Sequence, residues 1–399
     1  MLHSSTLSTP QNTSPLFIAF LVHFLLALDA LVIVPFSAVI TTQLAVSGAL
    51  AGYLTMAYAL AAGVTCLLFK GADNINTERR RCLTLLLGLA LVTGASVWVA
   101  SFEWMLIARV VAGVCGGGLA VVNLNLMVLQ VDDEHRRKHT ALLLSAFPLA
   151  LTLGVPLLLL LAGDHWQWSF AILALSLLAV WLVFFLICRR IAPGSEPDSG
   201  GQNPRFSEAV AERRVLWFAV AMISSAVLGT FVVSTQFPVM LHLNLTIGAG
   251  LLSGCYTFGG LGSFIVMQTY ARLKLTSGLS GQWIFILTAV MLGAMVCGFN
   301  TQDVWLAAGA FVFFIIASSA RSLILATEMI ATLPIAVRNH IIGIQNALQH
   351  FAVGVGGALG SALIATDRHG QLDFSVMLWA AAALGVMPVL LWRYRRWES

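Results

Sequence analysis

Twelve apolar runs follow one another along the chain, and each is long enough to cross a lipid bilayer as an α-helix, which takes about 20 residues. Composition supports this assignment, because 10% of the residues are charged, against about 25% in an ordinary soluble domain. The runs cover residues 16–40, 47–69, 82–101, 104–130, 139–162, 168–188, 215–241, 249–271, 280–299, 304–331, 340–365 and 373–393. We therefore predict an all-α membrane protein with twelve transmembrane helices.

One long polar stretch divides these helices into two sets of six. Residues 189–214, RRIAPGSEPDSGGQNPRFSEAVAERR, are rich in Gly, Pro, Ser and charge, which is typical of a linker. The predicted order is a cytoplasmic tail at 1–15, a six-helix bundle at 16–188, the cytoplasmic linker at 189–214, a second six-helix bundle at 215–393 and a cytoplasmic tail at 394–399.

The basic residues predict how the helices are oriented. Cytoplasmic loops of membrane proteins carry an excess of Lys and Arg. With the N-terminus inside, nearly all of the 21 lysines and arginines fall on the cytoplasmic side, so we expect both termini there. We predict a multi-pass protein of the plasma membrane, of the bacterial inner-membrane type. The net charge of +4 follows from this orientation and needs neither an anionic partner nor a nucleic acid.

Several classes of protein are excluded by the motifs that the sequence lacks. It has no Walker phosphate loop, no His-Glu-x-x-His and no Gly-x-Ser-x-Gly. Its six cysteines form no Cys-x-x-Cys pair and fall in or beside apolar runs, which is typical of small buried side chains. We expect no cofactor, no metal and no enzymatic activity. The expected partners are a small-molecule substrate, protons and the lipid bilayer, with the chain acting as a monomer.

A charged residue and two glycines share one face of the helix predicted at 104–130. Arg109, Gly113 and Gly117 are each four residues apart, so they line up along one side of the helix. An arginine at the centre of a bilayer costs about 3 kcal/mol or more, and it therefore needs a partner, whereas glycines let a second helix approach closely. Asp29, in LLALDALVIVP, is the only carboxylate well inside an N-terminal span. We predict that Asp29 and Arg109 form a pair.

Two roles are open for this pair. Burial favours the protonated form of a carboxyl group and a neighbouring arginine favours the ionised form, so a balanced carboxyl can take up and release a proton. In that case Asp29 carries a proton and Arg109 tunes its affinity. Alternatively, the two side chains form a permanent ion pair that locks two helices together. His23 lies on a different face of the same helix, and we expect it to be a packed side chain.

Four stretches, taken with the twelve spans and the linker, give the chain a family resemblance. They are Arg109–Gly118 (R-x-x-x-G-x-x-x-G), KGADNINTERRR at residues 70–81, WQWSF at residues 166–170, and the glycine-rich stretch Pro334–Gly360. In this order they resemble the major facilitator superfamily, in particular its drug:proton antiporter-like efflux branch with twelve helices. Two features depart from that branch: Gln167 replaces an arginine of the family's W-R-W-x-F pattern, and Gly154-Val155-Pro156 is followed by leucines instead of paired glycines.

The resemblance implies roles for further residues. Two six-helix bundles would enclose a central site and rock against each other. Gly154 and Pro156 would serve helix packing and gating with Gly113 and Gly117. Asp73, Arg79 and Arg80 would pair with helix ends and stabilise the outward-open state, unless they form only a basic cytoplasmic loop.

Polar residues within the spans are candidates for the substrate cavity, because such groups need partners or water in a membrane. Arg321 either meets an anionic group of the substrate or pairs with Glu328 or another helix. The others can line the cavity or form hydrogen bonds between helices. The predicted cavity residues are Asn123, Gln236, Arg321, Gln345, Gln349 and His350.

The function that we expect is secondary active transport, specifically proton-coupled efflux of a small organic molecule by alternating access. A symporter or facilitator for a sugar, amino acid or nucleoside is the alternative within the same class. A membrane sensor or scaffold that binds a ligand without moving it is the alternative from another class.

Overall fold

The computed structural model describes residues 14–72, 74–130, 139, 142–143, 145–190, 210–272, 277–333, 335–366 and 371–394. The described part is almost entirely helical, and ten of its helices are long and apolar enough to cross a membrane. The elements are α1 (Ser14–Gln43), η1 (Gly48–Leu50), α2 (Ala51–Leu68), α3 (Ile75–Ala95), η2 (Ser96–Trp98), α4 (Phe102–Gln130), α6 (Ala146–Leu149), the π-helical segment η3 (Ala150–Gly154), α7 (Val155–Ala162), α8 (Trp166–Arg190), α9 (Val210–Ser234), α10 (Phe237–Leu243), α11 (Ala249–Arg272), α12 (Ser277–Asn300), α13 (Val304–Thr332), α14 (Ile335–Ala362), β1 (Ala365–Thr366), β2 (Leu372–Asp373) and α15 (Ser375–Arg393).

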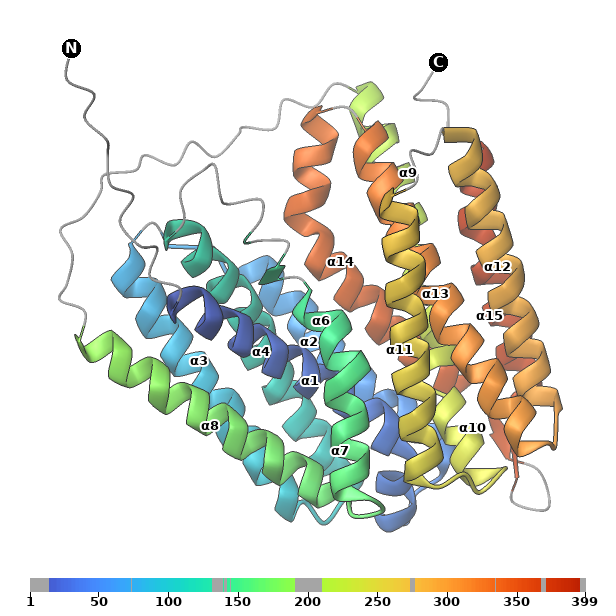
Figure 1. Cartoon of the computed structure of the whole chain (residues 1–399), viewed down its shortest axis with the longest axis horizontal. Coiled ribbons are helices and arrows are strands. Elements are labelled where there is room, and N and C mark those ends of the chain that lie inside the picture. The colour runs from blue at the N-terminus through green and yellow to red at the C-terminus, as the bar shows by residue number, and fades with distance from the viewer. Residues whose placement is uncertain are drawn as a thin grey trace.

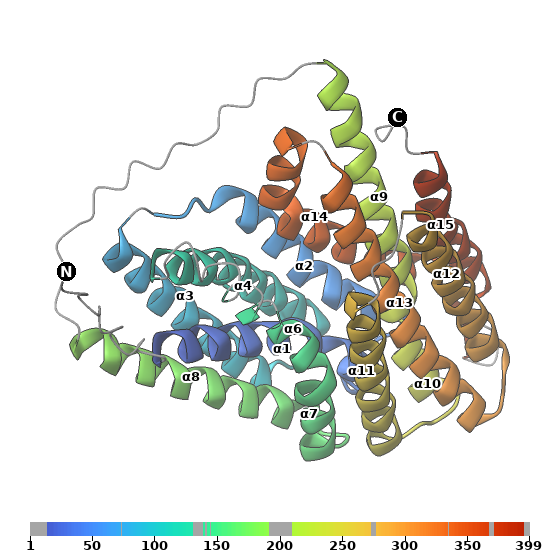
Figure 2. The ribbon, with the colours of Figure 1, turned by 45° about the horizontal axis from the view of Figure 1, so that its top comes forward.

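The helices form two halves that lie side by side (Figure 1). The first half contains α1 to α8 and the second contains α9 to α15. They meet where α2 packs along α14 and where η3 and α7 pack along α11. Figure 2 shows the same adjacency of α2 and α14 from a second direction. Gly52 makes this contact possible, because a Cβ at that position would collide with the carbonyl oxygen of Gly357.

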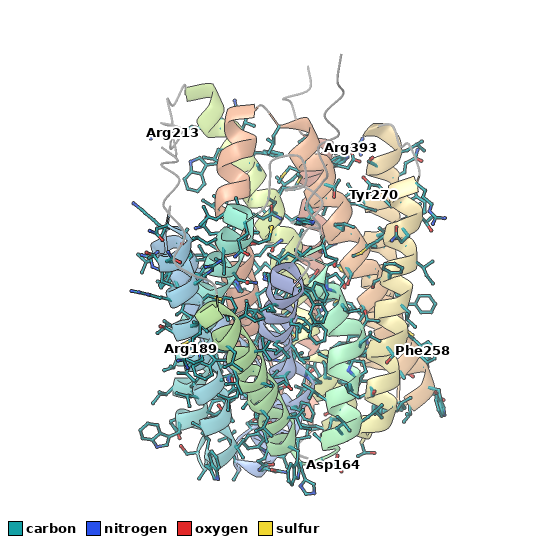
Figure 3. All side chains as sticks on the ribbon, turned by 60° about the vertical axis from the view of Figure 1, so that its left-hand side comes forward. Asp164, Arg189, Arg213, Phe258, Tyr270 and Arg393 are labelled. Carbon is teal, nitrogen blue, oxygen red and sulfur yellow. The ribbon has the colours of Figure 1, made fainter. Side chains whose placement is uncertain are left out.

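The hydrogen bonds between the halves lie toward one end of the molecule. The Ser361 hydroxyl on α14 accepts from the N–H of Gly52, in the first turn of α2, at 2.8 Å. On the other pair of helices, the Ser253 hydroxyl on α11 donates to the carbonyl of Pro156 on α7 at 3.1 Å. Asp164, in the turn after α7, marks this end in Figure 3, whereas Arg213 of α9 and Arg393 of α15 lie at the opposite end. The hydrogen bonds that join the halves therefore lie toward the Asp164 end, while the packing of α2 on α14 extends further along both helices.

Helix α3 begins seven residues before the predicted start at residue 82. The side chain of Asn74 accepts hydrogen bonds from the N–H groups of Asn76 and Thr77, so it caps the helix at Ile75. The basic cluster at residues 79–81 consequently lies on the first turns of α3, and the prediction that it forms a loop was wrong.

Prolines interrupt two of the predicted spans. The run predicted at 215–241 is divided into α9 and α10 by a turn at Thr235–Gln236, because the nitrogen of Pro238 cannot donate to the carbonyl four residues earlier. In the run predicted at 139–162, the π-helical segment η3 ends just before Pro156, for the same reason. The first run still forms one apolar span, Arg213–Leu243, and the described end of the second is an apolar helix at Ala146–Ala162, so the turn and the π-helical segment are local irregularities within the predicted spans.

A two-residue antiparallel hairpin, β1 with β2, connects α14 to α15, with Ala365 opposite Asp373 and Thr366 opposite Leu372. The Ser375 hydroxyl and N–H both donate to the Asp373 carboxylate, at 2.6 Å and 2.9 Å. These bonds hold the pKa of Asp373 below its ordinary value and fix the start of α15.

Candidate functional site

An ion pair lies at the centre of the first half. Asp29 of α1 and Arg109 of α4 are both completely buried, and 3.6 Å separates Nη1 of Arg109 from Oδ2 of Asp29. The hydroxyl of Thr93, on α3, donates to Oδ1 of Asp29 at 2.8 Å. The structure thus brings together the two charged residues that the sequence singled out, and it adds a hydroxyl from a third helix.

Aromatic rings, instead of hydrogen-bond acceptors, surround the Arg109 guanidinium. Its central carbon lies 5.0 Å from the centre of the Phe170 ring and 6.0 Å from that of Tyr58. Within the described residues, none of the three guanidinium nitrogens has a hydrogen-bond partner, and Oδ2 of Asp29 has none either. Arg109 is therefore held by charge attraction to one carboxylate and by contact with two ring faces.

Close packing of α4 on α2 fixes the position of this pair. A Cβ at Gly113 would collide with the carbonyl oxygen of Tyr58, and one at Gly117 would collide with the carbonyl oxygen of Ala62. The glycines therefore let the two backbones touch and place Tyr58 beside Arg109. Gly154, at the end of η3, lies similarly against the side chain of Leu28 on α1.

The turn between α2 and α3 contains a buried carboxylate that the sequence analysis missed. Glu78 is fully buried and accepts hydrogen bonds from the N–H of Ala72 and, at 2.9 Å, from the side-chain amide of Asn125 on α4. Asn125 also donates to the carbonyl of Ala72 at 2.9 Å. The sequence feature that could have revealed Glu78 is an acidic residue in the first turn of a helix. We missed it because we had predicted that this helix begins later.

Of the residues predicted for this turn, Asp73 lies outside the described residues. Arg79 is partly buried and Arg80 is exposed, both on the first turns of α3. Their neighbour Arg81 donates to the carbonyl of Lys70 at 3.1 Å, which ties the helix back to the turn.

The second half has a buried arginine of its own. Arg321 of α13 donates to the carbonyl of Gly385 on α15 at 2.8 Å. It also donates to the carbonyl of Ala226 at 2.9 Å and to the hydroxyl of Thr230 at 3.1 Å, both on α9. The carboxylate of Glu328, one of the alternatives considered for Arg321, instead accepts a hydrogen bond from the hydroxyl of Tyr270. Arg321 therefore joins three helices through neutral acceptors.

The other predicted cavity residues fall into two groups. Asn123 and Gln236 are buried and bonded between helices, the first to the carbonyl of Ala19 at 2.9 Å and the second to the hydroxyl of Ser361 at 3.1 Å. The second group lies on α14 and is partly exposed; it comprises Gln345, Gln349 and His350.

One pocket lies at the junction of the halves, at the end where Asp164 is found. It has a volume of about 540 Å³ and is lined by Ser47, Gly48, Leu243, Asn244, Thr366, Gln371 and Leu372. None of the predicted site residues lines it. Among the described residues, no group of three or more His, Cys, Asp or Glu side chains could hold a metal ion.

These observations define a class of protein before any relative is considered. The chain crosses the membrane several times, its two helical halves meet along two pairs of helices, and its first half encloses a carboxylate that faces an arginine. Such an arrangement is typical of a membrane transporter, in which ionisable groups inside the membrane mark a proton or substrate pathway.

Comparison with known proteins identifies the family. The family model described as Major Facilitator Superfamily matches residues 19–361, so the chain belongs to this superfamily, whose members are transporters rather than enzymes.

Solved structures share the fold across the whole chain. A bacterial homolog of the human lysosomal transporter Spinster, in an inward-facing and occupied conformation, is 16% identical, with a TM-score of 0.71 and 97% of each chain covered. A D-xylose-proton symporter is 14% identical, with a TM-score of 0.67, 96% of this chain and 97% of that chain covered. The human organic anion transporter MFSD10 (TETRAN) is 16% identical, with a TM-score of 0.59, 96% of this chain and 100% of that chain covered.

Proposed function

We propose that the protein is a proton-coupled secondary transporter that exports a small organic molecule by alternating access, as a member of the drug:proton antiporter-like branch. The observation that carries this proposal is the buried Asp29–Arg109 pair. We further propose that it acts as a monomer in a plasma membrane of the bacterial inner-membrane type, with twelve membrane crossings and both termini in the cytoplasm. Helix α14 and the segment from α6 to α7 supply the two crossings beyond the ten apolar spans.

The chemistry of the pair supports proton coupling. Among the described residues, Asp29 accepts one side-chain hydrogen bond, from Thr93, and its attraction to Arg109 acts over 3.6 Å without a hydrogen bond between them. Low dielectric around the pair penalises the ionised carboxylate, while Arg109 and Thr93 favour it. Protonation of Asp29 removes the attraction between α1 and α4, so the proton changes the balance between two arrangements of the same helices.

The contacts between the halves indicate which conformation is described. Hydrogen bonds join α2 to α14 and α7 to α11 toward the Asp164 end. With both termini in the cytoplasm, that end is the outer one, and the conformation is closed to the outside. Asp29 in this state would exchange its proton with the cytoplasmic side, as export driven by proton entry requires.

We assign the substrate to the partly exposed polar residues of α14. Gln345, Gln349 and His350 are partly exposed, whereas Asn123 and Arg321 are buried and donate hydrogen bonds to neighbouring helices. Gln236 combines a bonded amide with a buried carbonyl oxygen that has no partner among the described residues. The carbonyl oxygen of Gln236 is therefore available to accept a hydrogen bond from the substrate when the halves separate.

The experiment is transport into proteoliposomes with an imposed pH gradient and a pH-sensitive dye inside, for wild type and Asp29→Asn. A panel of lipophilic cations, sugars and amino acids is offered. We expect one substrate to move against a counter-flow of protons in the wild type, and coupling to be lost in the variant. Glu328→Gln, which removes a carboxylate from the second half, is the matched control and keeps coupling.

Three results would contradict the proposal in different ways. Normal coupling in Asp29→Asn would make the pair a static lock and remove the proton site. Movement of the proton and the substrate in the same direction would keep Asp29 as the proton site and make the protein a symporter. Ligand binding without movement of any substrate would support the sensor alternative.

A further inference from the structure

The WQWSF stretch at the start of α8 forms an aromatic wall beside the ion pair. Trp166 and Phe170 are one helical turn apart and fully buried, and their rings meet edge to face with centroids 5.7 Å apart. The indole N–H of Trp166 donates to the side-chain carbonyl of Gln43, at the end of α1, at 2.8 Å. This bond fixes α8 to the helix that carries Asp29.

Gln43 also bonds to Gln167, the residue at which this stretch departs from the family pattern. Its side-chain oxygen accepts a second hydrogen bond from Gln167 at 3.3 Å, and its amide donates to the carbonyl of Asp164 at 3.1 Å. A neutral glutamine at position 167 is therefore part of the network that positions the wall. Phe170, one turn further along α8 than Trp166, then lies with the centre of its ring 5.0 Å from the central carbon of the Arg109 guanidinium.

The ring keeps its interaction with Arg109 in both protonation states of the pair. The face of an aromatic ring attracts a cation, and this attraction does not depend on whether Asp29 is ionised. The Phe170 ring, 5.0 Å from the central carbon of the guanidinium, therefore adds to the forces that hold Arg109 at 3.6 Å from the Asp29 carboxylate. A cation held at that distance favours the ionised form of the carboxyl group.

We propose that Phe170 is a positioning residue for proton coupling: its ring holds Arg109 opposite Asp29, and thereby lowers the pH at which Asp29 takes up its proton. This inference rests on the proposed function, because it takes Asp29 to be the proton site. It assigns to the WQWSF stretch a role in setting the working pH of the transporter.

The other groups around the pair are few. From α2 the Tyr58 ring faces Arg109, and from α3 the Thr93 hydroxyl bonds to Asp29. From α4 the Cys115 thiol lies within electrostatic range of Asp29, and the Cys66 thiol of α2 lies within that range of Tyr58. None of them is a second carboxylate, so the proton affinity of the site belongs to Asp29.

A substrate-free titration tests this inference. Infrared difference spectra of the purified, lipid-reconstituted protein are recorded as the buffer pH is lowered, and the C=O band of the protonated carboxyl is assigned to Asp29 by its loss in Asp29→Asn. In Phe170→Leu we expect the midpoint of this band to move to higher pH by about half a unit to one unit, because Arg109 is held less firmly beside the carboxylate. Phe170→Tyr keeps the ring and the wild-type midpoint.

Phe184→Leu is the matched control, because Phe184 is a buried phenylalanine further along the same helix. We expect its midpoint to equal that of the wild type. If Phe170→Leu is not recovered as folded protein, Phe170→Met provides the same loss of the ring.

The outcomes separate the two proposals. A midpoint in Phe170→Leu that equals the wild-type value, while the band still disappears in Asp29→Asn, overturns the role of Phe170 and leaves the proton site intact. A titrating band that survives in Asp29→Asn overturns the proton site, and the role of Phe170 with it.

Discussion

Each half of the molecule buries one arginine, and the two are held in opposite ways. Arg321 donates three hydrogen bonds of 2.8 to 3.1 Å to two carbonyls and a hydroxyl on α9 and α15. Arg109 donates none to the described residues, and its charge faces a carboxylate at 3.6 Å and two aromatic rings. An arginine side chain thus joins helices in the second half, whereas in the first half an arginine side chain faces a titratable group.

The difference shows what makes a buried charge useful to a transporter. The carbonyl and hydroxyl acceptors of Arg321 do not change their charge when a proton binds elsewhere in the protein. Its hydrogen bonds therefore stabilise one packing of α9, α13 and α15. The partner of Arg109 can lose its charge by binding a proton, so the strength of this contact depends on pH. We infer that the second arginine is structural and that the first belongs to the coupling machinery.

Loss of the structural arginine should have the largest effect on stability. We expect Arg321→Met to lower the free energy of unfolding by about 3 kcal/mol, because three charge-assisted hydrogen bonds are lost while the cost of burying the charge is relieved. The loss should be the same at every pH, since carbonyl and hydroxyl acceptors do not titrate in the working range.

Thermal melts of the purified protein across a range of pH measure this effect. Arg272→Met, which removes an exposed arginine at the end of α11, is the control and should melt as the wild type does. A loss in Arg321→Met that disappears at one pH would mean that Arg321 has a titrating partner, and the contrast between the arginines would fail.

Loss of the coupling arginine should give a smaller and pH-dependent effect. In Arg109→Met the Asp29 carboxyl is buried without a cation, so the folded protein binds its proton more readily than the unfolded chain does. Stability then falls as the pH rises, because the folded state is the one that holds the extra proton. We expect a loss of about 2 kcal/mol near neutral pH and little loss near pH 5.

The same thermal melts measure this dependence, and the double variant Asp29→Asn with Arg109→Met is its control. Without a carboxyl group at position 29, the double variant should show no additional pH dependence relative to wild type. A single variant that loses equal stability at both ends of the pH range would show that Arg109 acts only through packing.

The hydroxyl of Thr93 should shift coupling in the same direction as the ring of Phe170. It donates to the ionised carboxylate of Asp29 at 2.8 Å, so Thr93→Val removes a bond that favours the charged form. We expect the infrared midpoint of Asp29 to rise by about one pH unit. Thr93→Ser, which keeps the hydroxyl, should restore the wild-type midpoint, and a fall in Thr93→Val would contradict the assigned geometry.

The sequence was enough to predict the helical membrane fold and to pair Asp29 with Arg109, because charges are rare inside apolar runs and each needs a partner. It could not predict Thr93, Tyr58 or Phe170. Hydroxyl and aromatic side chains occur throughout such helices, and nothing in their spacing shows which of them faces a given charge. The contact between them depends on how the helices cross.

Three features were left open or missed for the same reason, which is that the deciding partner lies on the backbone or in another helix. The acceptors of Arg321 are mainly carbonyl groups, which every residue has, so its bonding was left between alternatives. Glu78 was overlooked because the cap at Asn74 was not recognised and the basic cluster was placed in a loop. The turn before Pro238 was missed because the apolar run continues through it.

The smallest effect should come from one of the three acceptors of Arg321. Thr230→Val removes the hydroxyl that accepts from Nη2 at 3.1 Å, while the carbonyl of Ala226 still accepts from the same nitrogen at 2.9 Å. We expect a loss of about 1 kcal/mol, uniform across pH, and an unchanged infrared midpoint for Asp29. Thr288→Val on α12 is the control, since that hydroxyl bonds only to its own helix at 2.8 Å. A shift of the Asp29 midpoint in Thr230→Val would show that the two arginines are linked across the halves, and the division between a structural and a coupling arginine would no longer hold.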